Sequence, residues 1–126
     1  MSGEPFPKAS QLARGERRYR RKIASAKQWA AIIEAKRGPC RVCDLENVSW
    51  RGRIEYHHLL ARSLGGDDVA ENIVPLHSTC HRAIEGRLPA ALRRLSDSLT
   101  DAEYAYLVSK RGEGAVESMF GVSRGA

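Results

Sequence analysis

The sequence predicts an α+β domain in which a small two-stranded sheet and several helices surround a segment rich in metal ligands. Apolar residues recur at helical spacing before residue 38 and again after residue 88. Segments 54–58 and 73–76 are predicted as short strands, with the Gly65-Gly66 turn in the loop between them. All four histidines and all three cysteines lie between Cys40 and His81. The centre of the chain therefore carries the chemistry, and helices flank it.

The N-terminal residues 1–24 are predicted to form a basic, partly flexible arm. The net charge is +6, but residues 1–39 hold ten Lys/Arg against three Asp/Glu, whereas the remainder holds eleven against twelve. A basic run beside a folded domain is typical of a clamp on the phosphate backbone of a nucleic acid. The alternative is a solvated, partly disordered tail, and the two can coexist because such arms often order only on DNA. The candidate contacts in this arm are Arg17, Arg18, Arg20, Arg21 and Lys22.

The domain itself is predicted to span residues 25–111, beginning with a helix over about 26–37. Ser25 is a suitable N-cap for that helix, and Gly38-Pro39 ends it. Trp29, Ile32 and Ile33 recur at helical spacing and should face the core.

The remaining elements follow from turn and cap residues. Pro75 places the second strand at a sheet edge, and the next helix is expected over about 79–85. Two further helices are predicted over about 89–95 and from the capping box at Thr100 and Glu103 to about residue 111. Their apolar faces complete the core, with a dimer face as the alternative. Residues 112–126 are rich in glycine and are predicted to be a frayed tail.

Size and composition favour one small domain without a membrane segment. The chain has 126 residues, and 42% of them are hydrophobic, which is typical of a globular protein. No apolar run approaches the length of a membrane span, and the first residues lack a secretory core. We therefore expect a cytoplasmic protein. So small a core buries little apolar surface, which makes a metal staple physically sensible.

Two short pairs predict a structural zinc site. Cys40 and Cys43 form one pair, and His77 and Cys80 form the second. Four thiolate or imidazole ligands in such pairs are typical of structural zinc, and three cysteines with one histidine are an ordinary set. The alternative is that the cysteines are buried thiols or disulfides. Three cysteines cannot pair completely, and thiols of a cytosolic protein stay reduced.

A second set of residues indicates a different chemistry. His57 and His58 are adjacent in a predicted strand, so their side chains point to opposite faces. One can then bind a metal while the other activates a water. Asn72 follows His58 by fourteen residues, and His81 follows Asn72 by nine.

The order and spacing of these elements over about residues 40–86 resemble the HNH endonuclease family. The carriers of the resemblance are Glu55-Tyr56-His57-His58, Gly65-Gly66, Asn72-Ile73-Val74-Pro75-Leu76 and Cys80-His81. It implies a ββα-metal (HNH) finger, and the paired cysteines are similar to the zinc-knuckle branch of the family. The departure is His77, which replaces the usual cysteine.

The resemblance also implies roles. His57 and His81 would be ligands of a catalytic metal, with Glu85, one helical turn after His81, as a third ligand. His58 would be the general base. Asn72 would brace the loop and help to orient His58.

The implied reaction is hydrolysis of a DNA phosphodiester to 5′-phosphate and 3′-hydroxyl ends. Mg²⁺ or Mn²⁺ suits an oxygen-rich site, while two histidines also admit Ni²⁺, Co²⁺ or Zn²⁺. Arg51, Arg53 and Arg62 flank the histidine pair, and one of them is expected to hold a phosphate; the alternative is simple solvent exposure. Glu55 shares a strand face with His57 and is expected to brace a ligand or an arginine.

Two further classes of function stay open in the sequence. One is a non-catalytic, zinc-dependent nucleic-acid-binding module. The other is a nuclease directed at RNA, or a subunit that cuts only within a larger machine. The chain also resembles the small HNH proteins of bacteriophages, which implies a host-cytoplasmic location and partners in packaging, recombination or intron mobility.

Overall fold

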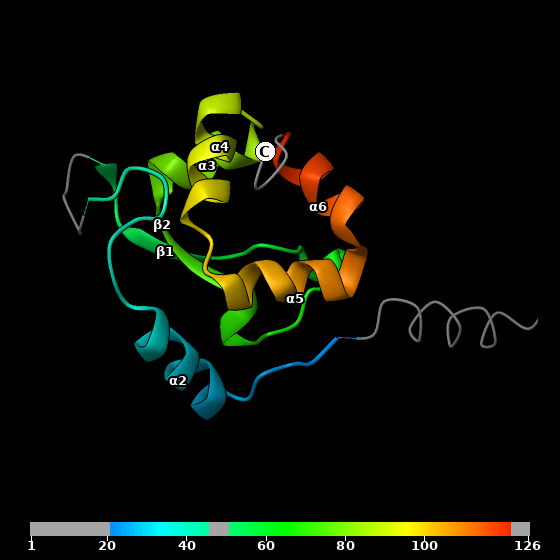
Figure 1. Cartoon of the computed structure of the whole chain (residues 1–126). Coiled ribbons are helices and arrows are strands. Elements are labelled where there is room, and N and C mark those ends of the chain that lie inside the picture. The colour runs from blue at the N-terminus through cyan, green and yellow to red at the C-terminus, as the bar shows by residue number, and fades with distance from the viewer. Residues whose placement is uncertain (1–20, 46–50, 122–126) are drawn as a thin grey trace, which may run out of the picture.

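The computed structural model describes residues 21–45 and 51–121, and it confirms the α+β class. Figure 1 shows a two-stranded sheet with helices on either side of it. In chain order the elements are α2 (Ala26–Lys36), β1 (Ile54–His58), η2 (Arg62–Leu64), η3 (Ala70–Asn72), β2 (Ile73–His77), α3 (Ser78–Glu85), α4 (Pro89–Ser98), α5 (Asp101–Arg111) and α6 (Glu113–Phe120).

The centre of the molecule is a ββα unit. β1 pairs antiparallel with β2, and the register places His57 opposite Val74 and His58 opposite Ile73. α3 begins directly after β2 and packs against both strands (Figure 1). The predicted first strand is confirmed residue for residue. β2 is one residue longer than predicted, and α3 starts one residue earlier, so the chain passes from strand to helix without a loop.

α2 forms where its cap residues place it. The Ser25 hydroxyl accepts a hydrogen bond from the backbone N–H of Gln28, and the Gln28 side chain accepts one from the backbone N–H of Ser25. The helix packs against β2 and η3. The expected core-facing residues Trp29, Ile32 and Ile33 are only half-buried, because α2 lies at the edge of the body rather than within it.

The last residues of the predicted arm are attached to the domain. The backbone N–H of Lys22 donates to Asp67 Oδ1 at 2.5 Å, and that of Ala24 donates to Asp68 Oδ2 at 3.0 Å. The backbone N–H of Asp68 donates in turn to the Lys22 carbonyl at 2.9 Å. The structured domain therefore begins before residue 25, and residues 21–24 are part of it. Residues 1–20, with most of the predicted arm, lie outside the described residues.

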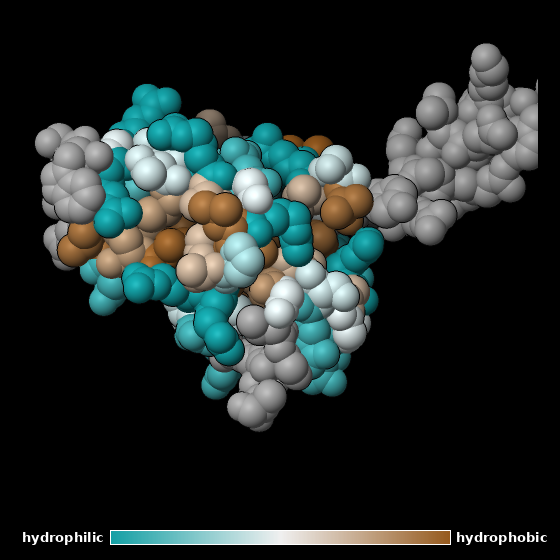
Figure 2. All heavy atoms as spheres, turned by 90° about the horizontal axis from the view of Figure 1, so that it is seen from above, coloured by the Kyte–Doolittle hydropathy of each residue, from teal (hydrophilic) through white to brown (hydrophobic). Residues whose placement is uncertain are grey.

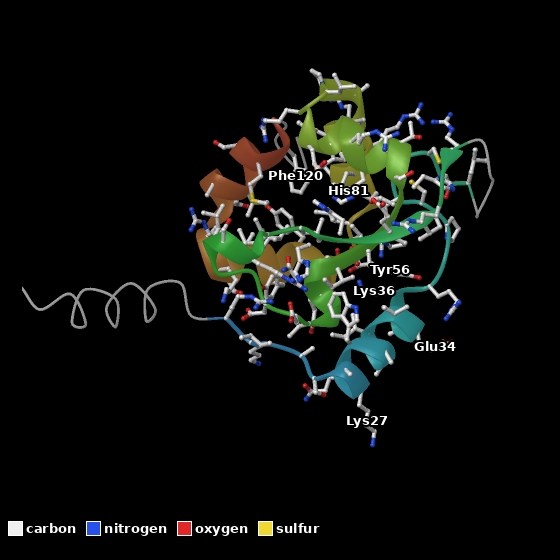
Figure 3. The ribbon with its side chains drawn as sticks, turned by 180° about the vertical axis from the view of Figure 1, so that it is seen from behind. Lys27, Glu34, Lys36, Tyr56, His81 and Phe120 are labelled. Atoms are coloured by element: carbon white, nitrogen blue, oxygen red, sulfur yellow. The ribbon has the colours of Figure 1, made fainter. Side chains whose placement is uncertain are left out.

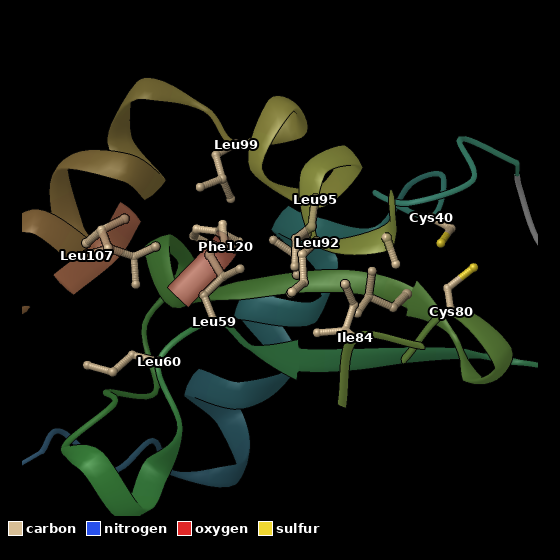
Figure 4. Packing of buried hydrophobic residues seen from close by; sticks show 14 residues of the cluster. Cys40, Leu59, Leu60, Cys80, Ile84, Leu92, Leu95, Leu99, Leu107 and Phe120 are labelled. Carbon is tan, nitrogen blue, oxygen red and sulfur yellow. The ribbon is translucent and has the colours of Figure 1, made fainter. Parts of the chain in front are cut away.

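α4 supplies Ala91, Leu92 and Leu95 to the core, and α5 supplies Leu107. α4 continues to Ser98, three residues beyond the prediction, and α5 begins at the predicted capping box of Thr100 and Glu103. Figure 4 shows the buried side chains of these helices facing those of the ββα unit. The cluster includes Leu59, Leu60, Ile84, Leu92, Leu95, Leu99, Leu107 and Phe120.

The prediction of a frayed tail from residue 112 is wrong for residues 113–120, which form α6. Val116 and Phe120 are 1% and 5% exposed and belong to the core. They lie four residues apart, on one face of the helix, so burying that face offsets the low helix propensity of Gly114. Gly121, with φ 69°, ends the helix in a left-handed conformation.

Seen from the side of α4 and α6, apolar side chains form a band bordered by hydrophilic ones (Figure 2). Among the described residues, no helix combines the length and apolarity that a membrane crossing requires.

Candidate functional site

Four potential metal ligands converge where the turn after α2 meets the junction of β2 and α3. The ligand atoms of Cys40, Cys43, His77 and Cys80 all lie within 4.8 Å of one another. Cys40, His77 and Cys80 are 1%, 0% and 3% exposed, and Cys43 is half-buried. Cys43 Sγ lies 3.2 Å from His77 Nδ1, and Figure 4 shows the sulfurs of Cys40 and Cys80 pointing toward each other.

Backbone hydrogen bonds also position this cluster. The N–H of Cys40 donates to the Leu45 carbonyl at 2.9 Å, and the N–H of Arg41 donates to the Pro75 carbonyl at 3.0 Å. The second bond fixes the cysteine turn to β2. The N–H groups of Val42 and His77 each lie 3.4 Å from Cys40 Sγ, a common second layer around a thiolate ligand.

The ionisation of the thiols supports a metal at this place. Burial raises the pKa of Cys40, but backbone N–H groups at Cys43, His77 and Val42 outweigh it and lower the pKa to about 7. Burial and the neighbouring Cys40 and Cys43 sulfurs raise the pKa of Cys80 to about 12. Three clustered sulfurs therefore cannot all be thiolates unless a cation lies among them. The donor set and its burial fit a structural zinc.

A second pair of donors comes from β1 and α3. His57 Nδ1 lies 3.0 Å from His81 Nε2, with the two rings edge to face. Glu85 Oε2 lies 3.6 Å from His81 Nε2, and Glu55 Oε1 lies 2.8 Å from the other ring nitrogen of His81. Two imidazole nitrogens that share one ion, each at about 2.1 Å, are separated by about 3 Å. The pair therefore fits a divalent cation, with a carboxylate orienting His81 from behind.

Burial, followed by the charges of His81 and His58, lowers the pKa of His57 from 6.5 to about 4. His57 is consequently neutral at pH 7, which is the form that binds metals.

His58 points to the other side of β1 and meets different partners. Its Nε2 lies 2.8 Å from Asp68 Oδ1, and its ring stacks on Trp29 with centroids 5.7 Å apart and planes at 12°. The guanidinium of Arg62 lies 3.4 Å from the same ring nitrogen. Burial raises the pKa of Asp68, but the N–H of Ala24, His58 and Arg21 outweigh burial and lower it to about 2.

Although the two histidines diverge, both reach one hollow of about 520 Å³. Its lining also includes Trp29, Arg62, His81 and Glu85. The candidate metal ligands, the candidate base and the cationic side chain of Arg62 therefore share one open space. A second hollow of about 680 Å³ borders the same two histidines on the side of α4 and α6, and its walls are mainly apolar.

Asn72 is fully buried and braces the loop between the strands. Its side-chain oxygen accepts from the N–H of Leu60 at 2.8 Å, and its amide donates to the carbonyls of Leu60 and Asp67 at 3.1 and 3.0 Å. Gly66 passes so close that a Cβ there would lie 1.8 Å from the Leu60 carbonyl oxygen. Asn72 bonds to the loop, and Asp68 on that loop bonds to His58. Any effect of Asn72 on His58 is therefore indirect.

The basic residues expected at the site differ in their surroundings. Arg62 lines the hollow, whereas Arg53 is 86% exposed and lies 3.8 Å from Glu55. Arg51 is half-buried. The guanidinium of Arg21 binds Asp68 and, at 2.7 Å, the Gly66 carbonyl, so it is engaged within the domain. Lys22 has an exposed side chain. Arg17, Arg18 and Arg20 lie outside the described residues.

Sequence reasoning missed two neighbours of His58. Asp68 follows the Gly65-Gly66 turn, but nothing in its position along the chain shows that it reaches His58. Trp29 was assigned to packing on the basis of helical spacing alone. Its contact depends on how α2 lies against the sheet, which spacing does not encode.

Comparison with family models matches residues 40–87 to the HNH endonuclease family. The match spans the cysteine turn, both strands and α3, which are the elements that build the two sites. Residues 40–87 of this chain are therefore similar to HNH domains, which bind nucleic acids and are usually nucleases. Neither the curated proteins nor the solved structures gave a match to the chain.

Proposed function

We propose that this protein is a metal-dependent HNH endonuclease that hydrolyses DNA phosphodiester bonds to 5′-phosphate and 3′-hydroxyl ends. The observation that supports the proposal most directly is that His57 and His58 face different partners. One ring faces His81 and the other faces Asp68, yet both border the same hollow.

In this proposal His58 is the general base. Its ring takes a proton from a water molecule as the water oxygen forms a bond to phosphorus and the bond to the 3′ oxygen breaks. The unprotonated nitrogen of a neutral imidazole is a suitable proton acceptor for this step. Arg62, with its side chain at the mouth of the hollow, holds a phosphate oxygen by charge.

His57 and His81, with Glu85, would hold the catalytic cation. A Mg²⁺ or Mn²⁺ ion held there would supply positive charge to the phosphoryl group and to the leaving oxygen. Glu55 accepts from His81 Nδ1–H and thereby keeps Nε2 of that ring free for the ion.

The Cys3His cluster is proposed to hold zinc and to have a structural role. Cys80 precedes His81 in α3, so the staple fixes the start of the helix that carries a catalytic ligand. The basic side chains of residues 1–20 and of Lys22 are proposed to contact the DNA backbone, together with Arg51 and Arg53 beside β1. Backbone contacts of this kind supply affinity without sequence specificity.

The alternative is a non-catalytic, zinc-dependent nucleic-acid-binding module. This alternative would use only the closed Cys3His cluster and the basic N-terminal charge and would not need the histidine site.

Cleavage of a supercoiled plasmid separates the two functions. Wild type, His58→Ala and the control Lys27→Ala, whose side chain points away from the body (Figure 3), are incubated with EDTA, Mg²⁺, Mn²⁺ or Ni²⁺. Wild type and the control should nick or linearise the plasmid only with metal, and DNA ligase should reseal the nicks. His58→Ala should cleave roughly 10²- to 10⁴-fold more slowly with an unchanged melting temperature.

Cleavage by His58→Ala at the wild-type rate would remove the general-base role. If wild type binds DNA but cuts it with none of these metals, the binding module replaces the nuclease.

A further inference from the structure

Residues 21–29 lie outside the HNH match, yet they reach the candidate base on two sides. From one side Arg21 and Ala24 bind Asp68, which contacts His58. From the other, Trp29 of α2 lies flat against the His58 ring. The HNH elements alone therefore do not account for the surroundings of this histidine.

Asp68 is held firmly where it meets His58. Its side chain is 5% exposed, and its Oδ2 accepts from the N–H of Ala24 at 3.0 Å. Its Oδ1 accepts from Arg21 and from His58 Nε2. The backbone N–H of Asp68 also donates to the Lys22 carbonyl. Residues 21–24 thus fix the position of the Asp68 carboxylate, and its Oδ1 faces Nε2 of His58.

This contact selects the tautomer of His58. Asp68 is ionised, and an ionised carboxylate only accepts hydrogen bonds. At 2.8 Å, His58 Nε2 must therefore carry the hydrogen. The neutral ring then keeps its lone pair on Nδ1, which is the nitrogen left to take a proton. Arg62 is 3.4 Å from Nε2, a longer contact that the shorter bond to Asp68 overrides.

Trp29 restrains the His58 ring from the face of the imidazole. The two planes are 12° from parallel, so the indole limits tilting of the imidazole out of the Asp68 bond. The capping box of Ser25 and Gln28 fixes the first turn of α2, where Trp29 sits.

We propose that residues 21–29 are a clamp on the general base: Asp68 and Trp29 are positioning residues for His58, and Arg21 positions Asp68. This inference rests on the proposed function, because it assigns the clamp to the same base. It also gives Arg21, the penultimate residue of the basic run, a role inside the domain rather than on DNA.

The chain offers matched controls for both contacts. Asp67 is also a buried, ion-paired carboxylate, but it binds Lys22 N, Tyr106 and Lys110 instead of His58. Ile32 is also half-buried in α2 but lines a different hollow, with Ala31 and Val69, and not the hollow that Trp29 shares with His58. The test compares Asp68→Asn with Asp67→Asn, and Trp29→Ala and Trp29→Phe with Ile32→Ala, all as full-length zinc-loaded protein.

Two measurements are made on each variant. Nitrogen-detected imidazole NMR reports the tautomer of His58 and needs no catalysis. Single-turnover cleavage of a labelled DNA duplex gives the rate, and binding of the same duplex in EDTA gives the dissociation constant.

We expect wild type and Asp67→Asn to show His58 protonated on Nε2. Asp68→Asn should lose this preference and cleave roughly 10- to 100-fold more slowly with the same DNA affinity, because an amide can also donate and so hold the wrong tautomer. Trp29→Ala should lose most of the rate, Trp29→Phe should keep it, and Ile32→Ala should match wild type.

The clamp is refuted if His58 carries its proton on Nδ1 in wild type, or if Asp68→Asn keeps the Nε2–H form. It is also refuted if each variant cleaves at the rate of its matched control. If wild type does not cut DNA at all, the proposed function fails, and the tautomer comparison still decides whether Asp68 orients His58.

Discussion

The two candidate metal sites lie in one small domain and differ in almost every physical respect. The Cys3His cluster is buried, its donors surround one point, and the backbone N–H groups around it serve the sulfurs. The site of His57 and His81 is half-buried and opens into a hollow, and carboxylates contact its rings. A closed set of four donors suits stability, whereas an incomplete set beside open space suits exchange and chemistry.

Residues that are adjacent in the sequence point in different directions and so have different partners. His57 and His58 diverge because side chains alternate along β1. Cys80 and His81 diverge because consecutive residues of α3 are about 100° apart around the helix axis. Of these elements, α3 serves both sites, so a loss at the Cys3His cluster should displace His81, whereas a loss at the open site should leave the fold intact.

The largest expected effect is on the closed site. Cys80→Ser should leave the chain unfolded or lower its melting temperature sharply, because zinc binding of roughly 10 kcal/mol exceeds or equals the whole stability of a small domain. Circular dichroism during heating, together with the zinc content, measures this. Val42→Ala, within the cysteine turn but not a ligand, is the control.

If Cys80→Ser has the same melting temperature as Val42→Ala, the Cys3His cluster does not stabilise the fold. The structural role assigned to this site would then be wrong.

An intermediate effect is expected at the anchor of the cysteine turn. Arg41, within the turn, binds Glu103 of α5 through two bonds of 2.8 Å, and Lys36 of α2 binds the same carboxylate. Glu103→Gln should lower the free energy of unfolding by about 3 kcal/mol at pH 7, since it leaves two cations without their buried partner. Urea unfolding of this variant beside Glu113→Gln, an exposed counterpart, measures the difference.

The same pair of variants tests the pH dependence. Burial raises the pKa of Glu103, but Arg41, Lys36 and the N–H of Thr100 outweigh it and lower the pKa from 4.5 to about 2. The stabilisation by the carboxylate is therefore complete above about pH 4.5 and is lost as the pH falls toward 2. The difference in the free energy of unfolding between wild type and Glu103→Gln should become smaller over that pH range. A constant difference would contradict an ionised Glu103 paired with Arg41 and Lys36.

The smallest effect on folding is expected at the open site. His81→Ala should keep the wild-type melting temperature but need roughly 10- to 100-fold more Mg²⁺ or Mn²⁺ for half-maximal cleavage, since it removes one ligand. Titration of the metal in the plasmid assay measures this shift. Excess metal should recover cleavage by His81→Ala but not by His58→Ala. Equal recovery of both variants would erase the distinction between ligand and base.

Local signals in the sequence were sufficient for most of the scaffold. The caps at Ser25 and Thr100, and the strand at residues 54–58, lie where they were predicted, because hydrogen bonds among near neighbours determine them. The Cys3His set was also predictable, since four strong ligands in two pairs have few other roles.

What the sequence did not reveal depends on packing between distant segments. Asp68 and Trp29 meet His58 only because residues 21–29 wrap around the loop, and no spacing rule reports that. α6 was missed for another reason: the glycines at 112 and 114 outweighed the four-residue spacing of Val116 and Phe120. That spacing was the available signal for α6, which buries both residues in the core.

The most direct test of the central claim, one closed zinc site and one open catalytic site, is to treat wild type with EDTA, remove the chelator, and measure zinc content and plasmid cleavage on the same sample. The account predicts one zinc retained per chain, no cleavage, and full cleavage after Mg²⁺ or Mn²⁺ is added. Cleavage that persists with the retained zinc alone, or loss of all zinc from a protein that stays folded, would contradict it.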